Sequence, residues 1–130
     1  MPWFKAYGAA LAAFLVLDAL WIWLFVRKFY DARIGDWMRE TPNMAVAGVF
    51  YLTYIAGVVY LAVRPGLAAG SLTTTLAHGA VVGALAYGTY TLTNYIILEN
   101  WTPGLVVTDI AWGAFLTALV AAAGHLAARG

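Results

Sequence analysis

Four long apolar segments alternate with short connections and take up most of the chain. They cover residues 3–26, 44–63, 74–98 and 105–128. A helix that crosses a membrane needs about 20 predominantly apolar residues, because a bilayer core is about 30 Å thick and a helix rises about 1.5 Å per residue. All four segments reach that length. The sequence therefore predicts an all-α integral membrane four-helix bundle, with residues 1–130 forming a single transmembrane domain.

The composition excludes several other classes of protein. Hydrophobic residues make up 64% of the 130 residues and charged residues 10%, whereas a soluble domain carries about 25% charged residues. The chain has no cysteine, which excludes disulfides, thiolate metal sites and cysteine nucleophiles. The net charge of +1 gives no electrostatic reason to expect nucleic acid as a partner. Membrane lipids are the partners that this composition predicts.

The ends of the second segment carry recognisable helix signals. Thr41 followed by Pro42 is typical of an N-cap and a first helical position. The run Arg64-Pro65-Gly66 predicts the end of the same helix, since proline and glycine both disfavour its continuation. We therefore expect a short connection between this helix and the third one.

The connection at residues 27–40 is the most charged part of the chain. Its first two residues are basic, and no small-residue cleavage pattern precedes them, so the first segment is expected to be a retained helix rather than a signal peptide. Ile34, Trp37 and Met38 follow at i, i+3 and i+4 among charged residues. This pattern favours a short helix in the membrane surface over a plain solvated loop.

Two aspartates lie inside otherwise apolar segments, and each is followed three residues later by a tryptophan. Asp18 precedes Trp21 in the first segment, and Asp109 precedes Trp112 in the fourth. An aspartate in the middle of a membrane helix costs about 2.5–3.5 kcal/mol on insertion scales. Each carboxylate therefore needs a polar partner, a proton or a water-lined cavity. Two such residues in so short a chain indicate a site.

Counting residues places both carboxylates in one half of the membrane. Asp18 lies about 4–5 Å and Asp109 about 11 Å from the midplane, on the same side. Tyr51 and Tyr54 of the second segment fall in that half as well, as do Tyr90 and Asn94 of the third. The predicted ligand- or ion-binding residues are Asp18, Trp21, Tyr51, Tyr54, Tyr87, Tyr90, Asn94, Asp109 and Trp112.

The spacing of these residues also predicts which way they face. Tyr87, Tyr90 and Asn94 follow one another at three and four residues, so they share one helical face. Each aspartate shares a face with its tryptophan. Because lipid cannot satisfy hydrogen bonds, we expect these faces to point into the bundle. Close approach of the helices would be allowed by the glycines at positions 79, 83 and 113.

Other candidate chemistry is weaker. His78 and His125 lie at similar depth on the side away from the carboxylates, and together they could in principle ligate a haem. Nothing around them favours haem over a structural role, so no cofactor and no metal site is expected. Ser71 is too far from either aspartate for a Ser–His–Asp arrangement. Glu99, in the third connection, is either a proton-entry group or a solvated loop carboxylate.

Several runs of the sequence are similar to those of one known family. The chain resembles the bacterial membrane family named domain of unknown function 2177, in the runs at 17–21, 51–57, 87–94 and 109–113 and in Trp101. The resemblance covers nearly the whole chain and implies four transmembrane helices in the inner membrane of a bacterium. At Thr91 the family often has an aspartate, so this chain keeps two of three acidic positions.

Three functions are compatible with these residues. The first is a transporter that moves a small hydrophobic or cationic ligand, with Asp18 exchanging a proton or cation and Asp109, Tyr90 and Asn94 completing the site. The second is an enzyme that uses the two carboxylates for acid–base chemistry on a lipid or isoprenoid. The third is a non-catalytic subunit or ligand-binding protein in which the polar residues brace the helices.

The distribution of basic residues leaves the orientation weakly specified. Four lie on the side of the first and third connections and three on the opposite side, which is almost no bias under the positive-inside rule. A homodimer, including an antiparallel one, is compatible with this balance.

Overall fold

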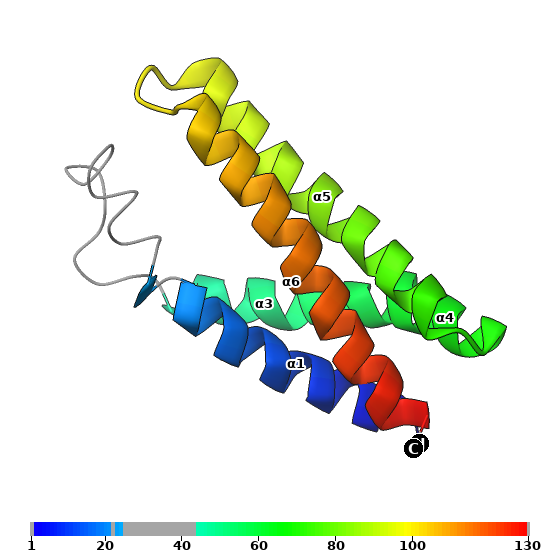
Figure 1. Ribbon diagram of the computed structural model, residues 1–130. Helices are drawn as coiled ribbons and strands as arrows, with labels where there is room; N and C mark the ends of the chain where they lie inside the picture. Colours follow the sequence, from blue (N-terminus) through cyan, green and yellow to red (C-terminus); the bar gives the residue numbers. More distant parts are fainter. Residues whose placement is uncertain (1, 22, 25–43, 130) are drawn as a thin grey trace.

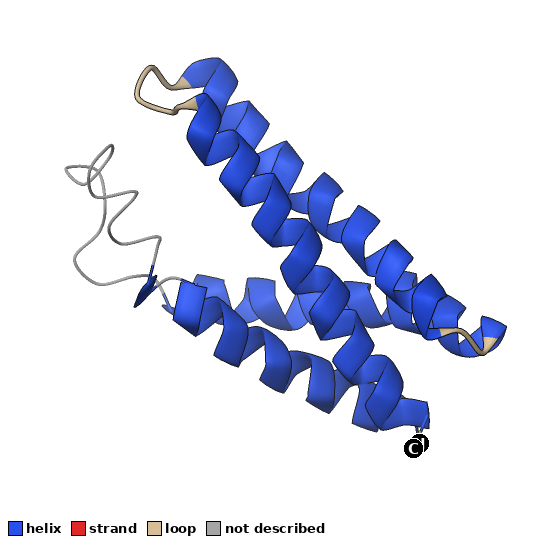
Figure 2. Cartoon of the chain, in the orientation of Figure 1, coloured by secondary structure: helices blue, strands red, loops and turns tan. Residues whose placement is uncertain are grey.

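The computed structural model describes residues 2–21, 23–24 and 44–129 of the chain. The described elements are α1 (Pro2–Trp21), α3 (Met44–Val58), the π-helix η3 (Val59–Val63), α4 (Arg64–Ala69), α5 (Leu72–Ile97) and α6 (Pro103–Arg129). Within these residues every regular element is helical, and loops are confined to the short connections (Figure 2). The prediction of an all-α membrane bundle is confirmed. The predicted surface helix at 27–40 and the Thr41–Pro42 cap lie outside the described residues.

Three of the helices are long and apolar enough to cross a membrane. They are Trp3–Trp21, Ala45–Ala69 and Pro103–Arg129, and the second of these runs through α3, η3 and α4. Helix α5 has 26 residues and is long enough, but its threonines, tyrosines and asparagine make it less hydropathic. It is therefore the helix that depends most on a protein partner, and it packs mainly against α6.

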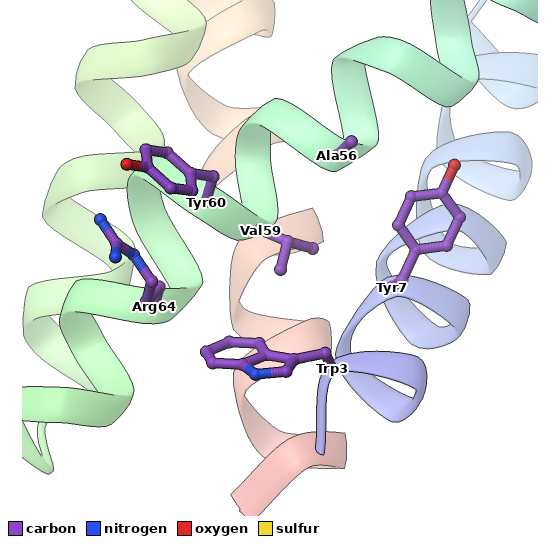
Figure 3. A pocket seen from close by; sticks show the side chains of 6 residues that line it. All are labelled: Trp3, Tyr7, Ala56, Val59, Tyr60 and Arg64. Atoms are coloured by element: carbon purple, nitrogen blue, oxygen red, sulfur yellow. The ribbon is translucent and has the colours of Figure 1, made fainter. Parts of the chain in front are cut away.

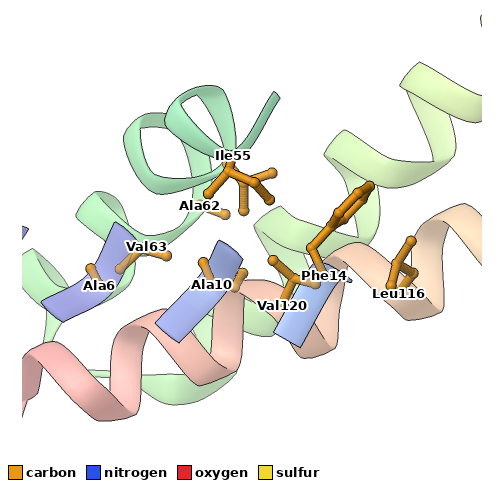
Figure 4. Close-up of a cluster of buried hydrophobic side chains, with 10 residues drawn as sticks. Ala6, Ala10, Phe14, Ile55, Ala62, Val63, Leu116 and Val120 are labelled. Carbon is orange, nitrogen blue, oxygen red and sulfur yellow. The ribbon is translucent and has the colours of Figure 1, made fainter. Parts of the chain in front are cut away.

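Two helices form an antiparallel hairpin, and the others cross one half of it. Figure 1 shows α5 and α6 side by side along their length, with α1 and α3 packed obliquely near the C-terminal half of α6. The loop end of the hairpin lies far from α1 (Figure 1). The buried apolar core lies where α1, the second helix and α6 meet (Figure 4). It consists of Ala6, Ala10, Phe14, Ile55, Val58, Ala62, Val63, Leu116, Val120 and Ala121.

The close contact between α5 and α6 depends on glycines. A Cβ atom at Gly83 would overlap the carbonyl group of Gly113. At Gly79, a Cβ would lie 3.0 Å from the carbonyl oxygen of Thr117. In a bilayer, helix association relies on such van der Waals contact because lipid tails are as apolar as the side chains. The expectation that these glycines allow close approach is confirmed.

The predicted end of the second helix at Arg64-Pro65-Gly66 is wrong. Proline removes one backbone donor and its ring crowds the carbonyl four residues earlier, here that of Leu61. The chain accommodates this with a wider π turn, in which the N–H of Arg64 donates to the carbonyl of Val59. The helix then continues to Ala69 and ends at Gly70, whose φ of 63° is left-handed.

The carbonyl of Leu61, which cannot accept a hydrogen bond from Pro65, accepts one from the next helix. His78 Nδ1 lies 3.4 Å from the carbonyl oxygen of Leu61, to which it donates a hydrogen bond. The π turn also keeps Ala62 and Val63 fully buried against the core. Pro65 therefore reshapes the helix without ending it.

We predict that Gly83→Ala will lower the free energy of unfolding by about 1–3 kcal/mol, because the new methyl group forces α5 and α6 apart. Gly57→Ala is the matched control, since nothing lies within 4 Å of a Cβ at that position. Both variants are purified in mild detergent and unfolded by adding SDS. Circular dichroism monitors the transition and gives the free energy of unfolding of each. Equal stability of the two variants would contradict the proposed contact.

Candidate functional site

Tyr87 lies at the centre of the predicted polar cluster. It is near enough to Asp18, Asp109, Tyr51 and Tyr54 to interact with each of them electrostatically. These residues come from α1, α3, α5 and α6. The structure therefore brings five of the nine predicted site residues into one neighbourhood between the helices.

The position of Tyr87 follows from the glycine opposite it. A Cβ atom at Gly113 would overlap the Tyr87 ring, so the ring lies directly on the backbone of α6. Asp109 precedes Gly113 by one turn on the same face, and it is only 4% exposed. The bare backbone of α6 thus lets a tyrosine of α5 reach the neighbourhood of a buried carboxylate.

Asp18 is bound by a tyrosine from the second helix. Its carboxylate accepts a hydrogen bond from the hydroxyl of Tyr51, and its exposed fraction is 9%. Phe14, one turn earlier on α1, packs its ring 5.0 Å from that of Tyr51 and 5.9 Å from that of Tyr54. This aromatic contact holds the two tyrosines beside α1.

Tyr54 connects the cluster to α6 through a residue that the sequence interpretation missed. Its hydroxyl lies 2.8 Å from that of Thr117, which is fully buried. The signal was present, since Asp109, Gly113 and Thr117 follow at intervals of four and lie on one helical face. A threonine in an apolar helix usually bonds its own backbone, so it did not stand out.

The two Asp-x-x-Trp motifs meet through their tryptophans. The rings of Trp21 and Trp112 are stacked with centroids 4.4 Å apart and an interplanar angle of 7°. Within the described residues, the buried indole N–H of Trp112 has no hydrogen-bond acceptor. The stack joins α1 to α6 beside the carboxylates and retains one unused donor.

Comparison with known proteins identifies the family. The sequence profile of the family described as "Predicted membrane protein (DUF2177)" matches residues 3–126. The chain belongs to this family. No curated protein and no solved structure matches it. The family description agrees with the three apolar spans of the structure, and so the chain is a membrane protein.

The DUF2177 resemblance makes Thr91 notable, and the structure gives that position a partner. Its hydroxyl is fully buried and accepts a hydrogen bond of 3.0 Å from the indole N–H of Trp101, in the loop before α6. In this chain the residue thus ties the loop end of the hairpin together. An acceptor is what the indole needs there, and either a threonine or an aspartate supplies one.

The prediction that Tyr87, Tyr90 and Asn94 all face the interior of the bundle is only partly correct. Tyr90 is 46% exposed, and its ring makes an edge-to-face contact with that of Trp101, with centroids 5.8 Å apart. Asn94 is half-buried and lies about 10 Å farther along the helix than Tyr87. Gly83 and Thr91 are buried, and the partly buried Tyr87 lies between them at intervals of four, so Tyr90 falls to the side of this line.

The histidines have separate protein partners. His125 is 1% exposed, and its Nδ1 lies 2.7 Å from the hydroxyl of Thr75. His78 is exposed and bonds the carbonyl of Leu61. Among the described residues, no three histidine, aspartate or glutamate side chains gather as metal ligands. The expectation that the chain binds no haem stays a prediction.

We predict that Tyr51→Phe will destabilise the protein by about 1–3 kcal/mol, because the buried Asp18 carboxylate loses its donor. Tyr95→Phe is the control, since that ring is 45% exposed. Both changes remove one hydroxyl and keep the ring. Unfolding midpoints in detergent will compare them, and a Tyr51 variant as stable as the Tyr95 variant would contradict the assigned bond.

Proposed function

We propose that this protein is a proton-coupled carrier of small lipophilic cations. The observation that supports the proposal most strongly is the neighbourhood of Tyr87, which two buried carboxylates from different helices share. Carboxylates at membrane depth are costly, and in membrane proteins they typically mark ion or proton pathways. A purely structural role, in which the carboxylates only hold the helices together, explains their presence poorly. Intramembrane hydrogen bonds average only about 0.6 kcal/mol, less than the cost of placing an aspartate in the membrane.

The contact between Asp18 and Tyr51 suits a group that changes its protonation state. A tyrosine hydroxyl donates to an ionised carboxylate, and it accepts from a protonated one. The same pair of side chains can therefore stay hydrogen-bonded with and without the proton. A proton can arrive and leave without separating the helices.

Two carboxylates around one set of tyrosine hydroxyls can exchange a proton for a cation. Either species balances the same negative charge, so the binding of one favours release of the other. Such competition is the coupling step that an exchanger needs. In this scheme Asp18 and Asp109 are the coupling residues, and Tyr51 and Tyr87 position them.

The aromatic residues beside the carboxylates indicate the class of cargo. The stacked Trp21 and Trp112 lie one helical turn from the two aspartates, and Phe115 packs 6.1 Å from Trp112. Aromatic faces attract cations, most strongly where water is excluded. An organic cation with apolar groups would meet both the negative charge and the rings.

The carrier is further proposed to lie in the bacterial inner membrane as a homodimer. The near balance of basic residues on the two sides is compatible with either a parallel or an antiparallel pair.

The test uses proteoliposomes and the lipophilic cation tetraphenylphosphonium. The vesicles are acidic inside, and valinomycin with equal potassium on both sides holds the membrane potential at zero. We expect uptake above that of protein-free vesicles, and loss of this uptake in Asp18→Asn and in Asp109→Asn. Glu99→Gln is the matched control, because it makes the same acid-to-amide change at an exposed position in the turn after α5.

Two results would contradict the proposal. One is wild-type uptake no faster than in protein-free vesicles. The other is full uptake by either aspartate variant. Circular dichroism would verify that the variants are folded. Loss of uptake in all three variants would show that acid residues in general, rather than this cluster, support the flux.

A further inference from the structure

A groove lies on the outer wall of the bundle, at the end opposite the carboxylate cluster. It has a volume of about 280 Å³ and runs between α1 and the second helix (Figure 3). Its walls are formed by Trp3, Tyr7, Ala56, Val59, Tyr60 and Arg64. A neighbouring hollow of about 380 Å³ shares Trp3 and Arg64 as walls, so these two residues stand where the hollows meet.

The groove changes from polar to apolar with depth. Helix α1 begins where the second helix approaches its end, so Trp3 and Arg64 lie at the outer end of the groove, the end that is nearest to the ends of these helices. Ala56 lies eight positions before Arg64 and so about 12 Å deeper. Beyond Ala56, the Tyr7 hydroxyl donates to the carbonyl of Leu52 at 2.9 Å, which joins α1 to α3 at the deep end of the groove.

Arg64 presents a positive charge at the outer end. Its guanidinium lies 4.0 Å from the centroid of the Tyr60 ring, and it makes no ion pair with a described residue. Figure 3 shows Arg64 on the second helix and the indole of Trp3 on α1, on different walls of the groove. The stacking on Tyr60 holds the guanidinium plane in place, which leaves its N–H groups available to a ligand.

The charge of this end of the bundle is positive as a whole. In the described part of the chain it carries Lys5, Arg64 and Arg129, and no acidic side chain. The described acidic residues Asp18, Glu99 and Asp109 belong to the opposite half. A ligand that enters the groove mouth therefore meets a cationic surface.

We propose that this groove is a binding site for an anionic phospholipid. Its phosphate binds the guanidinium of Arg64, to which it is matched in charge and geometry. The adjoining acyl chain lies along Val59 and Ala56 toward the deep end. Trp3 borders the headgroup region, the depth at which tryptophan is enriched in membrane proteins. The site is independent of the carrier proposal, because it uses none of the cluster residues.

Net charge decides which lipids bind well. Basic residues near a membrane surface attract anionic lipids, and a zwitterionic headgroup adds a cation that the positive end repels. Phosphatidylglycerol should therefore bind more tightly than phosphatidylcholine with the same acyl chains. The apolar lining should make binding of a lipid much tighter than binding of inorganic phosphate.

Native mass spectrometry of the purified protein in detergent tests this site. Equal concentrations of the two lipids are added, and retained lipid is counted on the folded protein. We expect phosphatidylglycerol to be retained preferentially, and Arg64→Gln to reduce its retention about fivefold. Arg64→Lys should keep most of the preference because the charge remains. Arg129→Gln is the matched control, since that exposed cation lies outside the groove.

A second variant tests the apolar part. Ala56→Phe places a ring in the deep half of the groove and should reduce retention of both lipids, with the headgroup preference unchanged. Equal retention by the Arg64→Gln and Arg129→Gln variants would overturn the proposal. Displacement of phosphatidylglycerol by an equal concentration of inorganic phosphate would overturn it too, because the acyl chain would then contribute nothing.

Discussion

The ring of Tyr87 lies on the bare backbone of Gly113, and the arrangement of the polar residues depends on this contact. It requires that α5 and α6 approach closely, which Gly83 permits on the other helix. With the ring in place, Tyr87 of the least hydropathic helix lies near enough to Asp18 and Asp109 to interact electrostatically with both. Any side chain at position 113 would push the ring out and separate α5 from the carboxylates.

Much of the fold, and part of the placement of the polar residues, could be predicted from the sequence. The apolar segments and the helical class follow from length and hydropathy, which act locally along the chain. The convergence of Asp18, Tyr51 and Asp109 on one half of the bundle followed from counting residues, because a helix has a fixed rise. The family resemblance was confirmed as well. These predictions needed no knowledge of packing.

The failures all concern packing between helices. Pro65 predicted a helix end, but a π turn and a hydrogen bond from His78 allow the helix to continue to Gly70. Tyr90 shares an approximate face with Tyr87, yet the crossing of α5 and α6 favours the line through Thr91. Thr117 gained its importance only from Tyr54 on another helix. Helical periodicity places a residue only within a broad arc of the helix surface. The packing of the neighbouring helices determines whether its side chain faces the interior.

The second helix gives the two halves of the molecule different chemistry. Tyr51 and Tyr54 belong to its α3 part and join the carboxylate cluster, whereas Tyr60 and Arg64 follow one another at i and i+4 and face the groove. The π turn, which joins the α3 and α4 parts of this helix, buries Ala62 and Val63 in the core. One half of the bundle thus holds the carboxylates that we propose to bind protons or cations, and the other holds the arginine that we propose to bind a lipid headgroup.

The central claim is that Asp18 and Asp109, on different helices, act as parts of one cluster. A double-mutant cycle of Asp18→Asn and Asp109→Asn, measured as free energies of unfolding in detergent, tests it directly. Residues that share partners show coupling energies of about 0.5–3 kcal/mol, and we expect a value in this range. Additive effects, within about 0.3 kcal/mol, would show two independent residues and contradict the account.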